Sequence, residues 1–248
     1  MDQLLDGRVA LITGGTRGLG LAIGERFAAS GATGVLLDLP SQKQDSPLPQ
    51  RFQFAAGDVT DEASLRSAVE TVLRSYGRLD IVVANAGVVP PWRETEVLDM
   101  EEWDRVMAVN VRGIAATLKH TTAALKQSAG SVVAMASINA FQAHPRQMLY
   151  TASKHAVLGI VRAAARDFGR YGIRVNAVAP GPIATAALLE RIRFRARNGP
   201  SEKEALAALA AEAPLGRLAT ADEVAKAVLF LASDLSSGIT GELLPVAA

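Results

Sequence analysis

Two side chains able to handle a proton stand four residues apart, Tyr150 and Lys154, and a serine, Ser137, precedes them by 13 positions. The run 150–166 contains no proline and is rich in Ala, Val and Leu, which predicts a helix with both side chains on one face. A nearby cation lowers the pKa of a phenol from its usual ~10. Lowering it to about 7 takes roughly 4 kcal/mol, so a second positive charge is needed, such as an oxidised nicotinamide ring. We therefore predict a tyrosine that takes a proton from an alcohol near neutral pH.

A glycine-rich turn lies near the N-terminus, Thr13-Gly-Gly-Thr-Arg-Gly-Leu-Gly20, between an apolar run at 8–12 and a helical pattern. Its spacing is T-G-x-x-x-G-x-G, with Gly14, Gly18 and Gly20 in the glycine places. Glycines let the backbone approach a pyrophosphate, and the N-terminus of a helix supplies N–H groups to bind it. This context predicts a dinucleotide-binding loop, with a purely structural turn as the alternative.

Asp38 follows the second apolar run and lies 18 positions after Gly20. A carboxylate there can accept hydrogen bonds from both hydroxyls of an adenosine ribose and repels a 2′-phosphate. Arg17 has the opposite effect, because a cation in the glycine loop could bind that phosphate. We expect repulsion from Asp38 to dominate, which predicts NAD rather than NADP; a solvated Asp38 without a ligand is the alternative.

The elements that must position these residues are six short apolar runs, at 8–12, 35–37, 52–56, 81–84, 131–136 and 174–178. Helices are expected at 21–30, from 60 or 61 to 76, at 99–127 with an interruption near Asn110, and at 150–166, and a loop is expected at 40–50. Because the apolar runs are continuous, they predict a doubly wound α/β fold, a parallel sheet with helices on both faces.

Unusual residues follow the ends of these runs: the glycine loop, Asp38, Asp58, Asn85, Ser137 and Pro180-Gly181. In an open parallel sheet the strand ends share one edge, and ligands bind at that edge. We therefore expect one site there.

Taken jointly, the motifs resemble those of a short-chain dehydrogenase/reductase over essentially the whole chain. They are Thr13 to Gly20, Asp58-Val59, Asn85-Ala86-Gly87, Asn110, Ser137, Tyr150-x-x-x-Lys154, and Pro180-Gly181 with Thr185. The resemblance implies a single domain, 1–248, with a Rossmann-type seven-stranded sheet of order 3-2-1-4-5-6-7, a substrate lid at about 183–215, and a homotetramer or homodimer. Ala84 stands where the family usually has a second Asn, and 244–248 lacks the family's V-D-G-G-like run, which puts C-terminal subunit contacts in doubt.

The resemblance also implies roles. Tyr150 would be the acid/base, Lys154 would lower its pKa and hold the nicotinamide ribose, and Ser137 would hydrogen-bond the reacting oxygen. Asn110 would hold the water that links Lys154 to bulk solvent. The residues expected at the cofactor are Gly14, Thr16, Arg17, Gly18, Leu19, Gly20, Asp38, Asp58, Val59, Asn85, Ala86, Gly87, Tyr150, Lys154, Pro180, Gly181, Ile183 and Thr185.

The substrate walls are expected from 137–150, from 88–92 and from the lid, with Asn139, His144 and Trp92 as candidate contacts. A structural His144 and a core Trp92 are the alternatives. The lid carries four arginines, Arg191, Arg193, Arg195 and Arg197. They divide between two helical faces, so a solvated basic face is favoured over an anionic substrate. No metal is expected, because His120, His144 and His155 lack zinc-ligand spacing.

The amino-acid composition excludes several other classes of protein. The 248 residues are 49% hydrophobic and 21% charged, which suits one large core and argues against disorder. The net charge of +1 gives no case for nucleic acid. The chain has no apolar run long enough for a membrane span, no signal-peptide pattern and no cysteine. A cytoplasmic protein with a small-molecule substrate is therefore expected.

The sequence thus predicts an NAD-dependent oxidoreductase that interconverts a secondary alcohol and a ketone, with Tyr150 as acid/base. Within the enzymes, the alternative is an NADPH-dependent 3-oxoacyl reductase, which Arg17 favours and Asp38 disfavours. Outside them, the alternative is a non-catalytic dinucleotide-binding sensor or scaffold. It is disfavoured because Asn110, Ser137, Tyr150 and Lys154 are all present.

Overall fold

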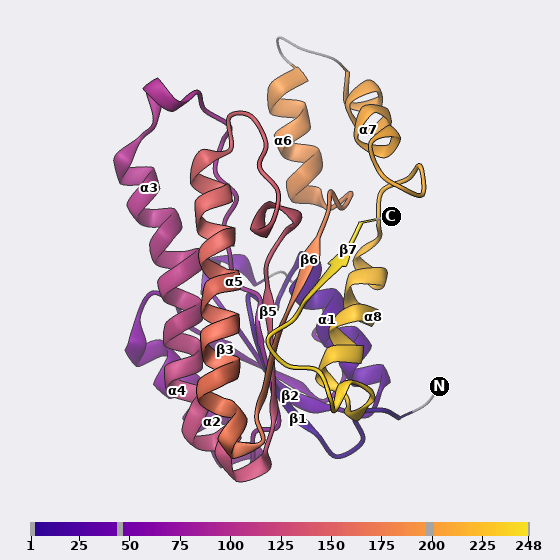
Figure 1. The fold of residues 1–248 in the computed structure, drawn as a ribbon. Helices are drawn as coiled ribbons and strands as arrows, with labels where there is room; N and C mark the ends of the chain where they lie inside the picture. The colour runs from indigo at the N-terminus through magenta and orange to yellow at the C-terminus, as the bar shows by residue number, and fades with distance from the viewer. Residues whose placement is uncertain (1–2, 44–46, 197–200, 248) are drawn as a thin grey trace.

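The computed structural model describes residues 3–43, 47–196 and 201–247, in which strands and helices alternate (Figure 1). The strands are β1 (Val9–Thr13), β2 (Thr33–Asp38), β3 (Phe52–Ala56), β4 (Ile81–Ala84), β5 (Ser131–Met135), β6 (Arg174–Pro180) and β7 (Leu243–Val246). The helices are α1 (Gly18–Ala29), α2 (Glu62–Tyr76), α3 (Met100–Met107), α4 (Gly113–Ser128), α5 (Met148–Phe168), α6 (Ala186–Ala196), α7 (Glu202–Ala211) and α8 (Ala221–Ala232).

The described strands form one seven-stranded parallel sheet of order β3-β2-β1-β4-β5-β6-β7, which confirms the predicted fold class and strand order. β1 pairs with β2 on one side and β4 on the other, so the strand order reverses between β1 and β4. In open parallel sheets, ligands bind beyond the strand ends at such a reversal point. The glycine loop follows β1, and Asn85 follows β4.

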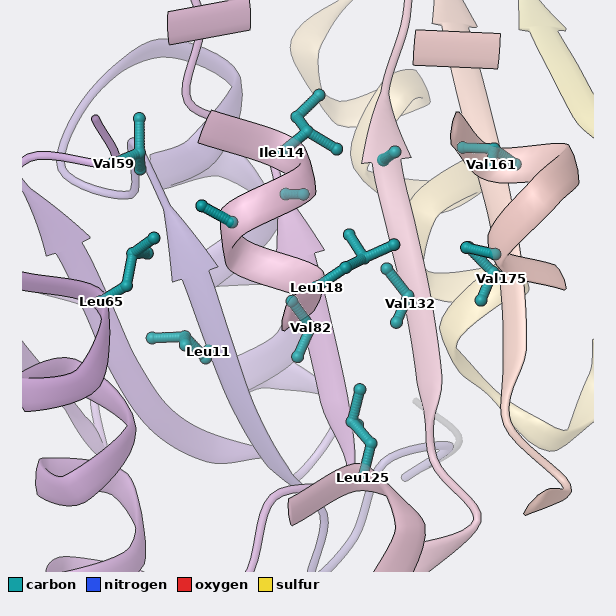
Figure 2. Close-up of a cluster of buried hydrophobic side chains, with 14 of the residues drawn as sticks. Leu11, Val59, Leu65, Val82, Ile114, Leu118, Leu125, Val132, Val161 and Val175 are labelled. Atoms are coloured by element: carbon teal, nitrogen blue, oxygen red, sulfur yellow. The ribbon is translucent and has the colours of Figure 1, made fainter. Parts of the chain in front are cut away.

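Successive strand residues pack on opposite faces of the sheet, so the central strands are buried on both sides. Leu11, Val82 and Val132 face a core closed by helices α2, α4 and α5 (Figure 2). Ile12 and Val83 join the opposite core, which helices α1 and α8 cover. Burying one such side chain contributes roughly 1.5–3 kcal/mol. The two cores therefore hold the strand ends, and the residues that follow them, in fixed positions.

The expected helix ends hold where a cap fixes them. The Asp61 carboxylate accepts from the backbone N–H groups of Ala63 and Ser64 at the start of α2, and Gly77, at φ +74°, ends that helix. The predicted interruption near Asn110 is a π-helical turn, Ala108–Arg112, between α3 and α4. Such turns occur frequently at functional sites.

Other elements are longer than predicted. Helix α1 starts at Gly18, three residues early, because the glycines of the loop form its first turn, and β2 starts at Thr33. Helix α5 extends the predicted 150–166 by two residues at each end. In the predicted loop 40–50, residues Pro40–Gln42 form a 3₁₀ turn, and 44–46 lie outside the described residues.

The predicted lid segment, 183–215, contains α6 and α7, which lie beyond the end of β6 (Figure 1). Ile183 forms a parallel bridge with Ala219, which ties the start of this segment to the residues before α8. Residues 197–200 lie outside the described part of the chain. Within that part, no helix combines the length and apolar character needed to cross a membrane.

Candidate active site

Helix α5 is anchored to the end of β5 by Lys154. The Lys154 ammonium donates a hydrogen bond to the Met135 carbonyl at 2.9 Å and lies 5.6 Å from the centre of the Tyr150 ring. Met135 is the last residue of β5 and precedes Ser137 by two positions. The structure therefore brings Ser137, Tyr150 and Lys154 to one corner of the sheet edge, as the sequence predicted.

Lys154 is 5% exposed, and burial lowers the pKa of its ammonium from 10.5 to about 8. That difference corresponds to about 3 kcal/mol of penalty on the charged form. The group still carries its charge at neutral pH, because pH 7 lies below that pKa. A buried cation with a strongly perturbed pKa at a ligand-binding edge is characteristic of a functional site.

Asn110 connects this corner to the end of β4. Its side-chain oxygen accepts from the Val88 N–H at 2.8 Å, and its amide donates to the Val88 carbonyl at 2.9 Å and to Ser153 Oγ at 3.2 Å. Ser153 Oγ in turn donates to the Tyr150 carbonyl at 2.8 Å. Both amide protons of Asn110 are thus used within the protein, so its side chain fixes α5 against the loop after β4.

Gly87 packs closely against these groups. A Cβ at this position would lie 3.3 Å from Asn110 Oδ1 and 3.8 Å from the Lys154 ammonium. A side chain here would therefore crowd Asn110, which glycine avoids.

The glycine loop is shaped by backbone contacts that only glycine allows. A Cβ on Gly20 would lie 1.9 Å from the Gly14 carbonyl oxygen, and Gly14 itself has φ +62°. Gly18 has φ +53°, with open space where its Cβ would point. The loop thus combines tight internal packing with an open side at the helix N-terminus, and both features fit a diphosphate.

The end of β4 holds this loop in place. The Asn85 amide donates to the carbonyls of Thr13 and Gly14, each at 2.9 Å. The Thr13 hydroxyl oxygen accepts from the N–H groups of Asn85 and Ala86 at 3.1 and 3.0 Å. These four hydrogen bonds fix the loop at the point where the strand order reverses.

Asp38 also supports the loop. Its Oδ2 accepts from the Thr16 N–H at 3.0 Å and from the Thr16 hydroxyl at 2.7 Å, and its Oδ1 accepts from the Leu39 N–H at 2.9 Å. A carboxylate has roughly four acceptor sites, so about one remains, on Oδ1. The predicted bonds from both ribose hydroxyls therefore require the Thr16 hydroxyl to give up its place.

Other predicted cofactor residues lie in the loops that follow β3 and β6 and are held by contacts within the protein. Asp58 Oδ1 accepts from the Thr60 N–H at 2.8 Å, and Val59 is buried against Gly113. Gly181, after β6, donates its N–H to the Val246 carbonyl, and Thr185 starts α6 by accepting from the Leu188 N–H. The protein contacts of Asp58 and Thr185 thus fix the loops after β3 and β6.

The three candidate substrate residues differ in their surroundings. Trp92 is 37% exposed beneath the Arg146 guanidinium, 5.8 Å from the ring centre, and lines a pocket together with Leu149 and Tyr150. His144 Nε2 is buried without a hydrogen-bond partner among the described residues. Asn139 is 5% exposed, and all its side-chain hydrogen bonds join it to other residues of the protein.

Of the four lid arginines, the structure describes the side chain of Arg193. Arg193 forms an exposed ion pair with Glu202, with Nε 2.6 Å from Oε2, which is consistent with a solvated face. Arg197 and the side chains of Arg191 and Arg195 lie outside the described part of the chain.

The described residues hold no group of three His, Cys, Asp or Glu side chains placed to bind a metal ion. His120 lies 2.8 Å from a Glu62 oxygen, and His155 lies 3.0 Å from the Thr151 carbonyl.

Sequence reasoning missed two supporting residues, Thr13 and Ser153. Both are buried, at 1% and 0% exposed, and both carry hydroxyls that bond to residues of the site. Their positions offered a signal, because Thr13 opens the glycine motif and Ser153 precedes the lysine.

A parallel sheet with this strand order, a glycine loop at its reversal point and a tyrosine–lysine pair beside it define a dinucleotide-binding oxidoreductase. A family model described as "Enoyl-(Acyl carrier protein) reductase" matches residues 14–248. The chain belongs to the short-chain dehydrogenase/reductase family.

Individual relatives match nearly full length. Short-chain dehydrogenase reductase 5 of Arabidopsis thaliana is 39% identical, covering 98% of this chain and 94% of the relative. The 3-oxoacyl-[acyl-carrier-protein] reductase FabG of Thermotoga maritima is 37% identical, and the match covers 98% of this chain and 97% of the relative. Among solved structures, levodione reductase has a TM-score of 0.90 at 32% identity, and the match covers 98% of this chain and 97% of that one. NAD⁺-bound xylitol dehydrogenase has a TM-score of 0.89 at 27% identity, and the match covers 98% of both chains.

Proposed function

We propose that the protein is an NAD-dependent oxidoreductase that interconverts a secondary alcohol and a ketone, with Tyr150 as the acid/base. The observation that carries this proposal is the buried Lys154 ammonium, 5.6 Å from the Tyr150 ring centre. A sensor or scaffold could also use Lys154 to hold the nicotinamide ribose. It would have no use for a phenol placed beside that cation, which only proton transfer requires.

The residues would divide the work as follows. In alcohol oxidation Tyr150 takes the hydroxyl proton, and the positive charge of Lys154 favours the phenolate that must precede this transfer. Ser137 hydrogen-bonds the reacting oxygen and restricts the substrate to a reactive arrangement. The bound nicotinamide supplies the hydride chemistry. The glycine loop and Asp38 would hold the adenosine half of the cofactor.

NAD is preferred over NADP in this proposal because Asp38 stands next to the loop as a carboxylate with about one acceptor site left. A 2′-phosphate there would meet a negative charge and bring no proton to donate. The solved relative xylitol dehydrogenase carries NAD⁺, which supports the same choice. Comparing kcat/KM for NAD and NADP tests it, and a clear NADP preference would overturn it.

The alternative, an NADPH-dependent 3-oxoacyl reductase, is supported by the relative of that name from Thermotoga maritima and by the exposed Arg17. A panel of cyclohexanol, xylitol and acetoacetyl-CoA, assayed with both cofactors, separates the two proposals. Turnover of acetoacetyl-CoA with NADPH alone would favour the reductase. Turnover of an alcohol with NAD would favour the dehydrogenase.

We propose that His144 forms a hydrogen bond with a second polar group of the substrate. Its buried Nε2 has no partner among the described residues, and leaving such an atom unpaired costs about 1–3 kcal/mol. A substrate hydroxyl or carbonyl placed there would recover that free energy. His144→Phe should then raise KM for a polyol about tenfold or more and spare a simple cyclic alcohol; equal effects on both would contradict this role.

We also propose a cytoplasmic homotetramer or homodimer that forms through α4 and α5. A surface hollow on the same side, at the α3–α4 junction, is lined by Asp104, Met107, Ala108, Val111, Arg112 and Ala115. It offers apolar side chains to a second copy. We further propose that the described lid residues, 183–196 and 201–215, become more protected from hydrogen exchange when NAD binds; equal exchange with and without NAD would contradict this.

A further inference from the structure

The side chain of Asn139 lies between Ser137 and the first turns of α5. The Asn139 N–H donates to Ser137 Oγ at 3.3 Å, and the Ser137 hydroxyl donates to Asn139 Oδ1 at 3.4 Å. On its other side, Asn139 Nδ2 donates to Gln147 Oε1 at 3.1 Å and to Thr151 Oγ1 at 3.0 Å. Gln147 is the N-cap residue of α5, and Thr151 follows Tyr150.

These bonds use both amide protons of Asn139, and the residue is 5% exposed. A buried and fully bonded amide has a fixed orientation, because turning it over would place a donor against the serine proton and an acceptor against Gln147. The direction of the Ser137 hydroxyl is thereby tied to the position of the helix that carries Tyr150.

We infer that Asn139 is a positioning residue that acts through Ser137, and not the substrate contact that its place in the sequence suggested. This inference rests on the proposed function. The backbone N–H of Asn139 holds one lone pair of Ser137 Oγ, which fixes where the oxygen stands. The contact from the serine proton to Oδ1 is long, at 3.4 Å, and therefore weak. A substrate oxygen can replace Oδ1 as its acceptor at little cost.

This positioning role requires a neutral hydrogen-bond acceptor at position 139. A neutral amide oxygen holds the serine proton loosely, whereas a carboxylate accepts hydrogen bonds more strongly. Asn139→Asp would keep the size of the side chain, but its carboxylate would draw the Ser137 proton away from the substrate and would lack the amide donor that bonds to Gln147 and Thr151. Protonating the new carboxyl should partly reverse the defect.

The test is a set of variants assayed with the best substrate of the cyclohexanol, xylitol and acetoacetyl-CoA panel. Asn139→Ala keeps the backbone N–H but removes the side-chain bonds to Gln147 and Thr151 that hold Ser137 in place relative to Tyr150. It should therefore lower kcat about 10- to 100-fold, since misplacing a reacting group by a small distance has effects of that size. The KM for the nicotinamide cofactor should change less than about threefold. In the Ser137→Ala background the same change should have little further effect, because residues that act through one group are non-additive.

Two further variants separate positioning from structural support. Asn139→Asp should regain kcat relative to wild type as the pH falls, and by more than its stability in urea unfolding recovers over the same pH range, since a protonated carboxyl can also restore one bond to Gln147 or Thr151. Asn176→Ala is the matched control. Asn176 is also buried and has both ends of its amide bonded, to the Ile239 carbonyl and the Glu242 N–H, but it lies in β6 on the side toward β7. It should lose stability and retain kcat.

Wild-type kcat in Asn139→Ala, or additive losses in the double variant, would overturn the inference while Ser137→Ala remains impaired. Failure of the proposed function would look different, because Ser137→Ala and Tyr150→Phe would then both turn over normally.

Discussion

Replacing Lys154 by Met should make the protein more stable at neutral pH while it removes activity. The buried ammonium has a pKa of about 8 in place of 10.5, so keeping it charged costs the fold about 3 kcal/mol. Methionine removes that cost and loses the hydrogen bond to the Met135 carbonyl, worth about 1 kcal/mol. The expected net gain at pH 7 is about 2 kcal/mol, or roughly 4–8 °C in Tm for a chain of this size.

The pH dependence identifies the cause. Between about pH 8 and 10.5 the unfolded chain binds the Lys154 proton and the folded protein does not. Wild type therefore gains stability as the pH rises through this window. Above it, lysine is neutral in both states, the burial cost is gone, and only the lost hydrogen bond remains. The variant should then be less stable than wild type by about 1 kcal/mol.

Urea unfolding at several pH values, without cofactor and at one chain concentration, measures both effects. Lys203→Met is the matched control, since Lys203 is exposed on α7. Its difference from wild type should stay nearly constant with pH. If Lys154→Met is no more stable than wild type at pH 7, or if its difference does not change sign, the claim that Lys154 is held charged at a cost is wrong.

Three further predictions concern the loop and the assembly. Gly20→Ala should weaken NAD binding at least tenfold in titrations, because its Cβ would lie 1.9 Å from the Gly14 carbonyl, whereas Gly238→Ala, with open space around it, should not. Thr13→Val removes the acceptor of two N–H groups and should lower stability by about 1–3 kcal/mol in urea unfolding; an unchanged midpoint would contradict this role. Sedimentation should give a dimer or tetramer, and a strict monomer at all concentrations would refute assembly through α4 and α5.

Much of the fold was predictable because its signals are local. Continuous apolar runs such as Val9–Thr13 gave the buried parallel strands, and a glycine or a capping carboxylate marked several helix ends. The strand order and β7 came from resemblance, since the four residues Leu243–Val246 carry a weak signal of their own. Boundaries failed where glycines begin a helix, as at Gly18 in α1.

The sequence indicated which side chains gather at the sheet edge, but not how they are connected to one another. The spacing of Tyr150 and Lys154 is local, but the amide of Asn85 reaches a carbonyl 72 residues earlier in the chain. The bonds of Asp38 to Thr16 and of Asn139 to Thr151 likewise depend on how separate loops meet at the sheet edge. Local patterns contain no information on such contacts, so Asp38 was expected to have more free acceptor sites and Asn139 to be more accessible than they are.

The most direct test of the central claim is Tyr150→Phe, with turnover followed at the reduced-nicotinamide absorbance and cofactor affinity measured on the same sample. The change removes one hydroxyl and leaves the ring beside Lys154. General acid–base catalysis contributes about 10²- to 10⁴-fold, so kcat should fall by at least that much while NAD binding changes less than about threefold. A variant that binds NAD and turns over at the wild-type rate would contradict the account.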